Sequence, residues 1–467
     1  MALKLFNTLT RSVQEFPPSA AAHPVGMYCC GPTVYDFAHI GNWRTFVFAD
    51  LVRRTLEFSG HAVKHVMNIT DVDDKIIRHV RERNLPLREF TGPFEAAFFT
   101  DLQTLHCLPP HQTPRATEHI PEIVALIEKL VARGVAYAAG DGSVYFSIDK
   151  YRGCGCTYGQ LQRLNFDELR VGERVAADEY EKEAVADFAL WKGRVPEDGN
   201  VFWPSPWGEG RPGWHIECSA MSMTALGETF DLHLGGEDLK FPHHEDEIAQ
   251  SEGATGKPFV KHWLHGAHLL VEGRKMSKRL GNFFTLRDLV AKGFTGRDVR
   301  FLLISACYRE TFNFTLDGLS GAKSSLARID ECVAKLRDVA GEVTAAPEAA
   351  FVQSFGEALA DDLNVAAAWG VVFEWVRETN KRLAANTLPP AGAAAALAAW
   401  EKVDSVLAVG AKSQADEIPA ELNALLAARQ AARQARDFKR SDAIRDELKA
   451  KGWIIEDTPK GPKLKKL

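Results

Sequence analysis

The chain has 467 residues, of which 46% are hydrophobic, and a formal net charge of −6 at pH 7. This length and composition predict a globular protein of roughly two to four domains. They exclude a membrane protein, because no stretch approaches the roughly 18 apolar residues of a membrane helix. The eight cysteines are too few for a disulfide scaffold. Since the N-terminus also lacks a signal-peptide pattern, we expect a cytoplasmic protein with reduced thiols.

The first elements have the order that opens a parallel sheet. An apolar run at Val25–Cys30 precedes a helix-like segment around Phe46–Val52 and a second apolar run at Ala62–Met67. This order predicts a βαβ unit. Val135–Asn200, with short strand-like pieces and many charges, is interpreted as an insertion. The segment Phe202–Gly213, crowded with Trp, Pro and Gly, is predicted to be an ordered loop without regular structure.

The next elements are mainly helical. Thr117–Arg133 places apolar residues on one face and is predicted to be an amphipathic helix. From Leu316 the chain is rich in helix-forming residues, with breaks at Leu388–Gly392 and near Gly410–Pro419. Trp453–Asp457 is predicted to be a strand.

Two short motifs could handle phosphate. His39–Asn42 (His-Ile-Gly-Asn) lies at a helix start, where unpaired N–H groups and the helix dipole suit a phosphate. His39 could donate to it, and Gly41 allows close approach. Lys275–Arg279 (Lys-Met-Ser-Lys-Arg) is a cationic loop that could stabilise charge on a departing pyrophosphate. Taken alone, each motif is more often an ordinary helix start or an exposed charged turn.

Four other side chains are of metal-ligand type. Cys30 ends the first strand, Cys218 lies in the segment Gly213–Ser219, and His243 and Glu247 have the spacing that shares one helix face. Two cysteines, a histidine and a carboxylate are suitable zinc ligands, although this spacing is not a standard zinc signature. From the residues alone, buried apolar cysteines beside a surface His–Glu pair remain the alternative.

Together these motifs resemble a known family. His39–Asn42 resembles the HIGH signature and Lys275–Arg279 the KMSKS signature of class I aminoacyl-tRNA synthetases, with Asn42 and Arg279 as departures. Within that class, the chain is similar to cysteinyl-tRNA synthetases from about Leu5 to Lys466. The segments that carry this similarity are Gly26–Asp36, Asn68–Lys75, Pro212–Ser219 and Phe241–Gln250.

The resemblance implies an α/β fold: a Rossmann-type parallel-sheet catalytic domain with an insertion, then an α-helical bundle and a small C-terminal α+β domain. The implied parts are the two catalytic halves 1–134 and 201–262, the insertion 135–200, the KMSKS-loop region 263–315, the helical bundle 316–410 and the anticodon-binding domain 418–467.

The resemblance also implies the site residues. The zinc ligands would be Cys30, Cys218, His243 and Glu247, whereas Cys29 would face the other side of its strand and His244 would project elsewhere. The catalytic residues would be His39, Asn42, Lys275 and Lys278. ATP, with Mg²⁺, would contact His39, Gly41, Asn42, Gly236, Asp238 and Lys278. The cysteine pocket would be lined by Gly31, Thr70, Trp214 and Asp238, although Trp214 could simply be a packing residue.

The resemblance implies an enzyme that uses ATP to convert L-cysteine to cysteinyl-adenylate and transfers the cysteinyl group to the 3′-terminal adenosine of tRNA(Cys). The enzyme is expected to be a monomer. Serine differs from cysteine by a single atom, so pocket shape would separate the two only weakly. Zinc binds a thiolate much better than a neutral hydroxyl, so a zinc ion with an open position would distinguish them by sulfur chemistry.

The C-terminal end is basic, with 12 Lys+Arg against 6 Asp+Glu from Leu425 to Leu467. Such a surplus suits RNA phosphates, and Phe438 or Trp453 could stack on an unpaired base. The alternatives are a solvated tail and core aromatics. Two other functions remain open: the related ligase that joins cysteine to an amino sugar in mycothiol synthesis, which lacks this terminal domain, and a non-catalytic RNA-binding paralogue.

Overall fold

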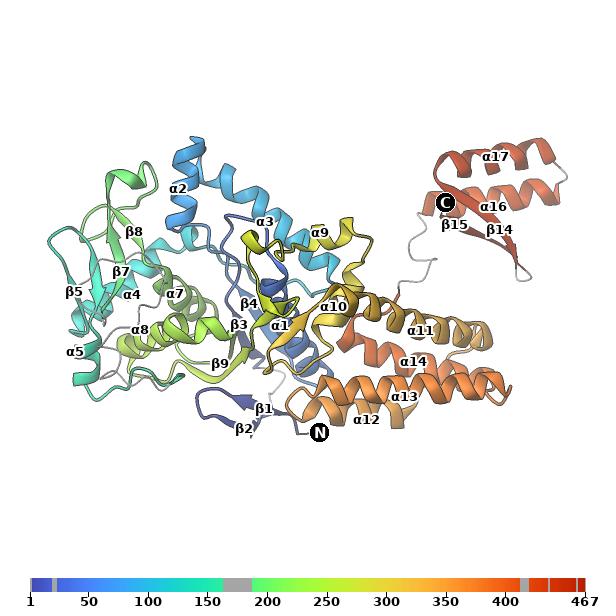
Figure 1. The fold of residues 1–467 in the computed structure, drawn as a ribbon, viewed down its shortest axis with the longest axis horizontal. Helices are drawn as coiled ribbons and strands as arrows, with labels where there is room; N and C mark the ends of the chain where they lie inside the picture. The colour runs from blue at the N-terminus through green and yellow to red at the C-terminus, as the bar shows by residue number, and fades with distance from the viewer. Residues whose placement is uncertain are drawn as a thin grey trace. The chain divides into compact units, whose positions relative to one another are not determined.

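The computed structural model describes residues 2–18, 23–162, 187–411, 420–435, 437–458 and 461–466 (Figure 1). The chain divides into two compact units, Met1–Val409 and Gly410–Leu467. Among the described residues, each helix is too short or too polar to cross a membrane.

A four-stranded parallel sheet forms the centre of the first unit. Its spatial order is β10–β9–β3–β4, and every neighbouring pair is parallel. All residues of β3 are buried, as expected for a strand covered on both faces. The predicted Rossmann-type sheet is therefore confirmed. Its strands are β3 (Val25–Cys29), β4 (Val63–Met67), β9 (Phe230–Gly236) and β10 (Val260–Gly266), and the helices packed on it include α1 (Ile40–Phe58) and α7 (Trp214–Leu226).

Three helices lie between β4 and the predicted insertion, and only the last of them was predicted from the sequence. The expected amphipathic helix begins later than predicted, at Ile120, because a short 3₁₀ turn (Ala116–Glu118) precedes it. The bounds in this part are α2 (Asp74–Arg83), α3 (Leu87–Thr104) and α4 (Ile120–Ala132).

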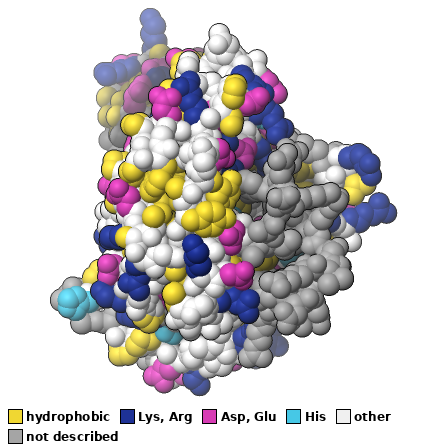
Figure 2. All heavy atoms as spheres, turned by 90° about the vertical axis from the view of Figure 1, so that its left-hand side faces the viewer, with side chains coloured by type: hydrophobic (Ala, Val, Ile, Leu, Met, Phe, Trp, Pro, Cys, Tyr) yellow, Lys and Arg dark blue, Asp and Glu magenta, His cyan; other side chains and the backbone are white. Residues whose placement is uncertain are grey.

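The insertion carries an antiparallel sheet in the order β5–β6–β7–β8. The described elements here are β5 (Ala136–Ala138), β6 (Val144–Phe146), α5 (Ile148–Gly153), β7 (Phe188–Gly193), a 3₁₀ turn (Pro196–Asp198) and β8 (Gly210–Pro212). The last strand, β8, lies beyond the predicted insertion 135–200. Figure 2 views the molecule from this side, where apolar side chains gather in the middle of the face with charged side chains of both signs around them. Residues 163–186 of the insertion lie outside the described residues.

Strand β8 corrects the prediction that Phe202–Gly213 lacks regular structure. Its residues pair with β7, from Trp191 opposite Pro212 to Gly193 opposite Gly210. A Cβ at Gly210 would lie 2.3 Å from the carbonyl oxygen of Lys192, so glycine is what permits this approach. Pro212 is tolerated because β8 is an edge strand.

The remaining elements of the first unit support the site and lead into the bundle. After β9 the chain forms a 3₁₀ turn (Glu237–Leu239), a π-type turn (Lys240–His244) and α8 (Glu245–Thr255). A small sheet in the order β12–β11–β13 follows. The bounds are β1 (Lys4–Asn7), β2 (Ser12–Glu15), β11 (Leu269–Val271), β12 (Arg274–Lys275), a 3₁₀ turn (Lys278–Leu280), α9 (Leu286–Ala291), α10 (Gly296–Leu303) and β13 (Phe312–Phe314).

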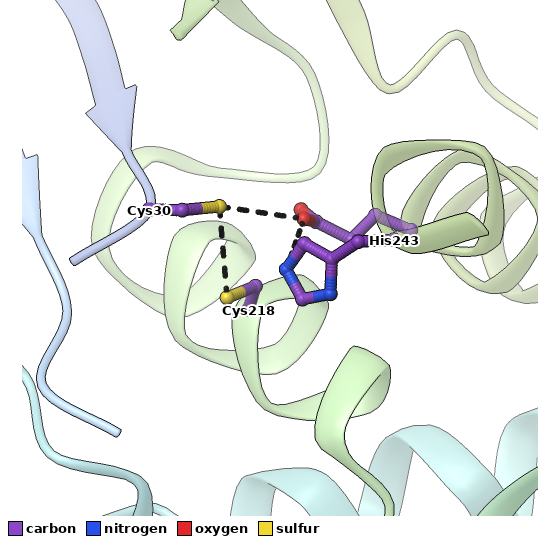
Figure 3. A group of neighbouring side chains, drawn as sticks. Cys30, Cys218 and His243 are labelled. Carbon is purple, nitrogen blue, oxygen red and sulfur yellow. Dashed lines mark hydrogen bonds and ion pairs between the residues drawn. The ribbon is translucent and has the colours of Figure 1, made fainter. Parts of the chain in front are cut away.

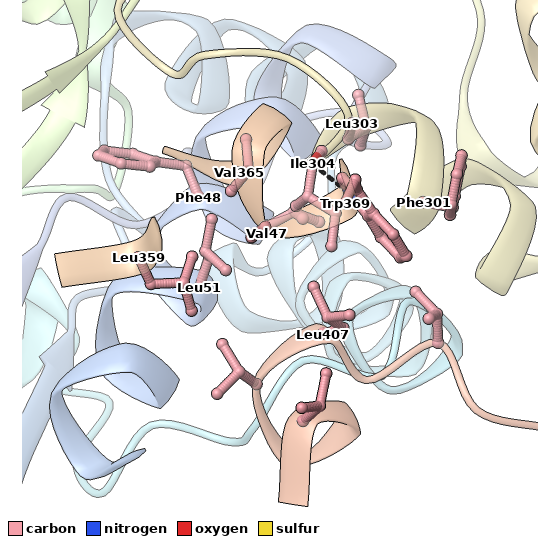
Figure 4. Close-up of a cluster of buried hydrophobic side chains, with 14 of the residues drawn as sticks. Val47, Phe48, Leu51, Phe301, Leu303, Ile304, Leu359, Val365, Trp369 and Leu407 are labelled. Atoms are coloured by element: carbon pink, nitrogen blue, oxygen red, sulfur yellow. Dashed lines mark hydrogen bonds between the residues drawn. The ribbon is translucent and has the colours of Figure 1, made fainter. Parts of the chain in front are cut away.

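Four helices form the predicted bundle, and its core is continuous with that of the sheet domain. Figure 4 shows Val47 and Leu51 of α1 among side chains from α10 and from the bundle helices. Trp369 also donates a hydrogen bond from Nε1 to the carbonyl oxygen of Ile304 (3.0 Å). A break expected at Leu388–Gly392 is found slightly earlier, at residues 385–389, because α14 already begins at Pro390. The helices are α11 (Leu316–Ala340), α12 (Ala349–Ala360), α13 (Val365–Ala384) and α14 (Pro390–Leu407).

In the described residues of the second unit, two helices and a hairpin surround a small core of their own. Trp453 packs in this core, as one of the two interpretations expected, whereas the Phe438 side chain is 62% exposed. Most of the second break predicted at Gly410–Pro419 falls on residues 412–419, outside the described residues. The elements are α16 (Ala420–Gln434), α17 (Phe438–Ala450), β14 (Trp453–Thr458) and β15 (Gly461–Lys466).

Candidate active site

A cavity of about 890 Å³ opens where the parallel strands end. Residues just after β3, β9 and β10 line it, as expected because ligands bind at the carboxyl edge of such sheets. Nine of the predicted site residues line this cavity together: Cys30, Gly31, His39, Gly41, Asn42, Trp214, Gly236, Asp238 and Lys275. Thr70 is not among the lining residues; it is 2% exposed, and its hydroxyl accepts a hydrogen bond from Asn68 Nδ2 (3.2 Å).

The first turn of α1 is closed by a reciprocal pair of hydrogen bonds. The Asn42 N–H donates to His39 Nδ1 (3.2 Å), and the His39 N–H donates to Asn42 Oδ1 (3.1 Å). This capping box fixes the imidazole at the mouth of the helix N-terminus. It also gives Asn42 a positioning role that the short motif alone did not reveal.

The segment from β12 to α9 folds back onto this helix start. The Ile40 N–H donates to the carbonyl oxygen of Phe284 (2.9 Å), and the His39 ring packs edge-on against Phe283 at 5.2 Å. A Cβ built on Gly41 would lie 3.2 Å from the Met276 methyl group. The two motifs, more than 200 residues apart in sequence, thus meet across one wall of the cavity.

Asn282 organises the cationic loop and was not found by sequence reasoning. It is 8% exposed, and its amide nitrogen donates to the carbonyl oxygens of Val271 and Lys275, both at 3.2 Å. Its oxygen accepts from the Ser277 N–H (2.8 Å). Lys275 is exposed toward the cavity. The side chain of Lys278 lies outside the described residues.

Gly31 lies where the ends of β3 and β4 come closest. Its N–H donates to Asn68 Oδ1 (2.9 Å). A Cβ at this position would lie 1.6 Å from the backbone carbonyl oxygen of Asn68. Only glycine allows this approach, which sets the position of the preceding residue, Cys30.

The four predicted metal ligands converge behind the cavity. One donor atom from each of Cys30, Cys218, His243 and Glu247 lies within 4.8 Å of the others, and all four residues are buried. Figure 3 shows Cys30 at the end of β3, Cys218 on α7 and His243 just before α8 pointing toward one another. The two sulfur atoms are 3.9 Å apart, and His243 Nε2 lies 3.1 Å from Glu247 Oε1. Cys30 alone of the four lines the cavity.

Further histidines surround this cluster. His215 Nδ1 lies 2.8 Å from His243 Nδ1, which leaves His243 Nε2 to face the other donors. His233 Nε2 lies 2.9 Å from Glu247 Oε2. These contacts fix the directions of the ring and the carboxylate, as outer partners do at metal sites.

The expectation that His244 projects away from the cluster is wrong. Its Nε2 lies 3.4 Å from Cys30 Sγ, because His243 and His244 belong to a π-type turn rather than to a regular α-helix. His244 and His233 thus form a second possible donor set with Cys30 and Glu247. Cys29 does face the other side of its strand, in the core beside α1.

The charges of the cluster suit a metal cation. A hydrogen bond with Cys30, helped by His243, lowers the pKa of Cys218 to about 6 although burial opposes ionisation. Burial also disfavours a charged Glu247, yet His233 and His243 lower its pKa to about 2. Burial likewise opposes a charged His243, but Cys218 and Glu247 raise its pKa to about 10. A thiolate and a carboxylate are therefore favoured in the interior, balanced by the positive charge of His243, and a bound metal cation would supply the same balance.

Known proteins are similar to this chain over its whole length. Residues 17–324 match the model of the tRNA synthetases class I (C) catalytic domain, residues 354–409 the DALR domain and residues 415–462 the cysteinyl-tRNA ligase anticodon binding domain. A cysteine–tRNA ligase of Chlamydia felis is 45% identical across 100% of this chain and 98% of its own length. That of Protochlamydia amoebophila is 47% identical across 99% and 98%.

The chain belongs to the cysteine–tRNA ligase family. The fold is also that of other class I synthetases. A methionyl-tRNA synthetase of Mycobacterium tuberculosis, solved with methionyl-adenylate, superposes with a TM-score of 0.59 at 13% identity, covering 83% of this chain and 90% of that one. The cluster of Cys, His and Glu side chains described above is consistent with a metal site in a ligase of this family.

One further residue of this ligase lines the cavity without having been predicted. Glu217, on α7, is 1% exposed. Burial, followed by the nearby Cys218, Asp71 and Asp73, raises the pKa of its carboxyl well above the usual value. The only signal in the sequence was its place beside Cys218.

Proposed function

We propose that this cysteine–tRNA ligase selects its amino acid through the buried set Cys30, Cys218, His243 and Glu247. Family membership supports the reaction: ATP and cysteine give cysteinyl-adenylate and pyrophosphate, and the cysteinyl group passes to the terminal adenosine of tRNA(Cys). The observation that carries the specificity is the convergence of two thiols, an imidazole and a carboxylate within 4.8 Å at the inner end of the cavity.

The donor set fits zinc. Sulfur and nitrogen donors with one carboxylate are a zinc-type combination, and all four residues are withdrawn from water. Zinc held there would bind the substrate's thiolate and discriminate against the hydroxyl of serine. Cys30, which also lines the cavity, marks the side from which cysteine enters. Gly31 and Trp214 line the adjoining wall, and Thr70 supports it from behind.

The nucleotide part of the cavity works by orientation and charge. The α1 N-terminus with His39, Asn42 and Gly41 receives the phosphates. Lys275 and Lys278 supply positive charge where pyrophosphate departs, with Mg²⁺ accompanying ATP. Gly236 permits close approach of the nucleotide, and Asp238 contacts its ribose or the amine of cysteine. The cysteine carboxylate then attacks the α-phosphate within one oriented complex.

The RNA-binding part is assigned to the bundle and the second unit. The match to the anticodon-binding domain covers residues 415–462, and Phe438 presents an exposed ring on that unit. Stacking of an unpaired base on such a ring is a common mode of RNA recognition. We assign the ligase as a monomer.

The test is a pair of assays on the purified chain. Cysteine-dependent ATP–pyrophosphate exchange should occur and should require metal, and the same enzyme should charge tRNA(Cys). Absence of exchange would overturn the proposed activity. Exchange without charging would instead point to the ligase that joins cysteine to an amino sugar. Exchange that persists after complete removal of the metal would overturn the proposed role of zinc.

A further inference from the structure

Glu217 is a buried acid at the wall of the cavity, and one of its carboxyl oxygens has no hydrogen-bond partner in the part of the chain that the structure describes. Its side chain lines the cavity although the residue is only 1% exposed. Among the described residues, Oε2 has no hydrogen-bond donor, and the carboxyl makes no ion pair with a lysine or arginine. Buried carboxylate oxygens are normally satisfied, because an unsatisfied one costs considerable free energy. The position therefore calls for a donor that arrives with a ligand.

The location of Glu217 specifies which part of a ligand it meets. Trp214, Glu217 and Cys218 have the spacing that places them on one side of α7. Trp214 lines the cavity, and Cys218 belongs to the metal-binding set. Glu217 thus lies between the aromatic wall and the position proposed for the substrate's sulfur.

The surroundings of Glu217 favour a cationic donor. Cys218, Asp71 and Asp73 are its acidic neighbours, and His243 is a cationic one with a smaller effect. Both oxygens of Asp71 already accept hydrogen bonds from Thr117, at 3.0 and 2.6 Å, and Asp73 Oδ1 accepts from the Ile76 N–H at 2.6 Å. These acids add negative potential while most of their own acceptor oxygens are occupied. A positively charged N–H donor is the ligand group that such a site attracts.

We propose that Glu217 accepts a hydrogen bond from the α-ammonium group of the substrate cysteine. The inference rests on the proposed function, because sulfur bound at the metal site places the ammonium group, two carbon atoms away, beside Glu217. The enzyme then recognises both ends of an α-amino thiol: the sulfur at the metal site and the nitrogen at Glu217. Asp238 is left to the ribose of ATP.

The test compares two ligands in the full-length, metal-loaded enzyme. L-Cysteine carries the ammonium group, whereas 3-mercaptopropionate has the same thiol and carboxylate without it. The affinity for cysteine is measured by calorimetry and as KM in pyrophosphate exchange, and that for 3-mercaptopropionate as an inhibition constant. The variant is Glu217→Gln. The control is Asp74→Asn, a cavity-lining acid that already has partners in Lys192 (2.8 Å) and Arg211 (2.5 Å).

Glu217→Gln should weaken cysteine binding about tenfold to a hundredfold and leave 3-mercaptopropionate binding unchanged. Asp74→Asn should keep the wild-type ratio between the affinities for the two ligands.

Three results would overturn the proposal. Glu217→Gln could weaken the binding of both ligands equally, or of neither, or the weaker binding could be explained by loss of metal, which mass spectrometry measures. If Glu217→Gln does not fold, Glu217→Asp should retain a preference for cysteine, and its loss of that preference with a normal fold would overturn the proposal. A wild-type enzyme that binds cysteine without exchange activity would refute the proposed function and leave the Glu217 comparison measurable by calorimetry.

Discussion

Replacing Gly31 by alanine should disrupt cysteine activation, because the added methyl group has no room. Its Cβ would lie 1.6 Å from the carbonyl oxygen of Asn68 and 2.7 Å from the carbonyl carbon. Cβ contacts below 3.0 Å essentially never occur, so the two backbones would have to separate by at least about 1.4 Å. Both colliding atoms are backbone, so a change of rotamer cannot relieve the clash.

The displacement would be felt first at Cys30, the neighbouring residue and a proposed metal ligand. It would also break the hydrogen bond from the Gly31 N–H to Asn68 Oδ1 (2.9 Å). Misplacement of a reacting group by about 1 Å can cost about a hundredfold in rate. We expect kcat/KM for cysteine in pyrophosphate exchange to fall at least about a hundredfold in Gly31→Ala. The free energy of unfolding should fall by about 1–3 kcal/mol, measured in urea.

Gly26→Ala, in the strand β3 that precedes Gly31, is the matched control. There the nearest atom to the new Cβ is Phe230 Cβ at 3.4 Å, an ordinary contact. This variant should keep wild-type cysteine activation and metal content. Wild-type activity in Gly31→Ala, or equal losses in both variants, would refute the link between this close approach and the site.

Three further predictions test other parts of the account. Cys218→Ser should lose bound metal and raise KM for cysteine far more than KM for ATP in pyrophosphate exchange; equal changes would mean that the residue is only structural. Lys275→Met should lower kcat of exchange about a hundredfold with little change in cysteine affinity, and an unchanged kcat would exclude a role in stabilising pyrophosphate. Burial, with a contribution from Arg53, lowers the pKa of His65 from 6.5 to about 3, so below pH 6.5 the unfolded state takes up a proton that the folded state does not. His65→Leu should therefore reduce the loss of unfolding free energy between pH 7.5 and 5.0 by about 2 kcal/mol in urea titrations, and an unchanged pH dependence would contradict the shift.

The sequence predicted the parallel sheet and the bundle because both have strong local signals. The runs at Val25–Cys30 and Ala62–Met67 became neighbouring strands, with the helix between them. The strand β8 was missed, because a Gly- and Pro-rich segment carries no strand propensity. It pairs only because Gly210 allows the neighbouring strand to approach. The domain boundaries within the first unit stay predictions.

Site residues that belong to a recognisable motif could be predicted from the sequence, whereas those whose roles depend on packing could not. The ligand set was suggested by residue type and family resemblance, and the fold brings those four side chains together. The direction of His244 depended on a turn that helical spacing does not describe. Asn282 has no distinguishing pattern in the sequence, and Glu217 has only its place beside Cys218. Their roles follow from contacts and burial among segments that meet only in the folded chain.

The most direct test of the central claim is X-ray absorption at the zinc edge, on enzyme with and without cysteine. The account predicts one zinc per chain with two sulfur ligands at about 2.3 Å in the free enzyme, and a third sulfur when cysteine binds. Serine at the same concentration should leave the spectrum unchanged. A sulfur number that stays constant on cysteine binding, or full cysteine-dependent exchange by enzyme that holds no metal, would contradict recognition of the thiol by zinc.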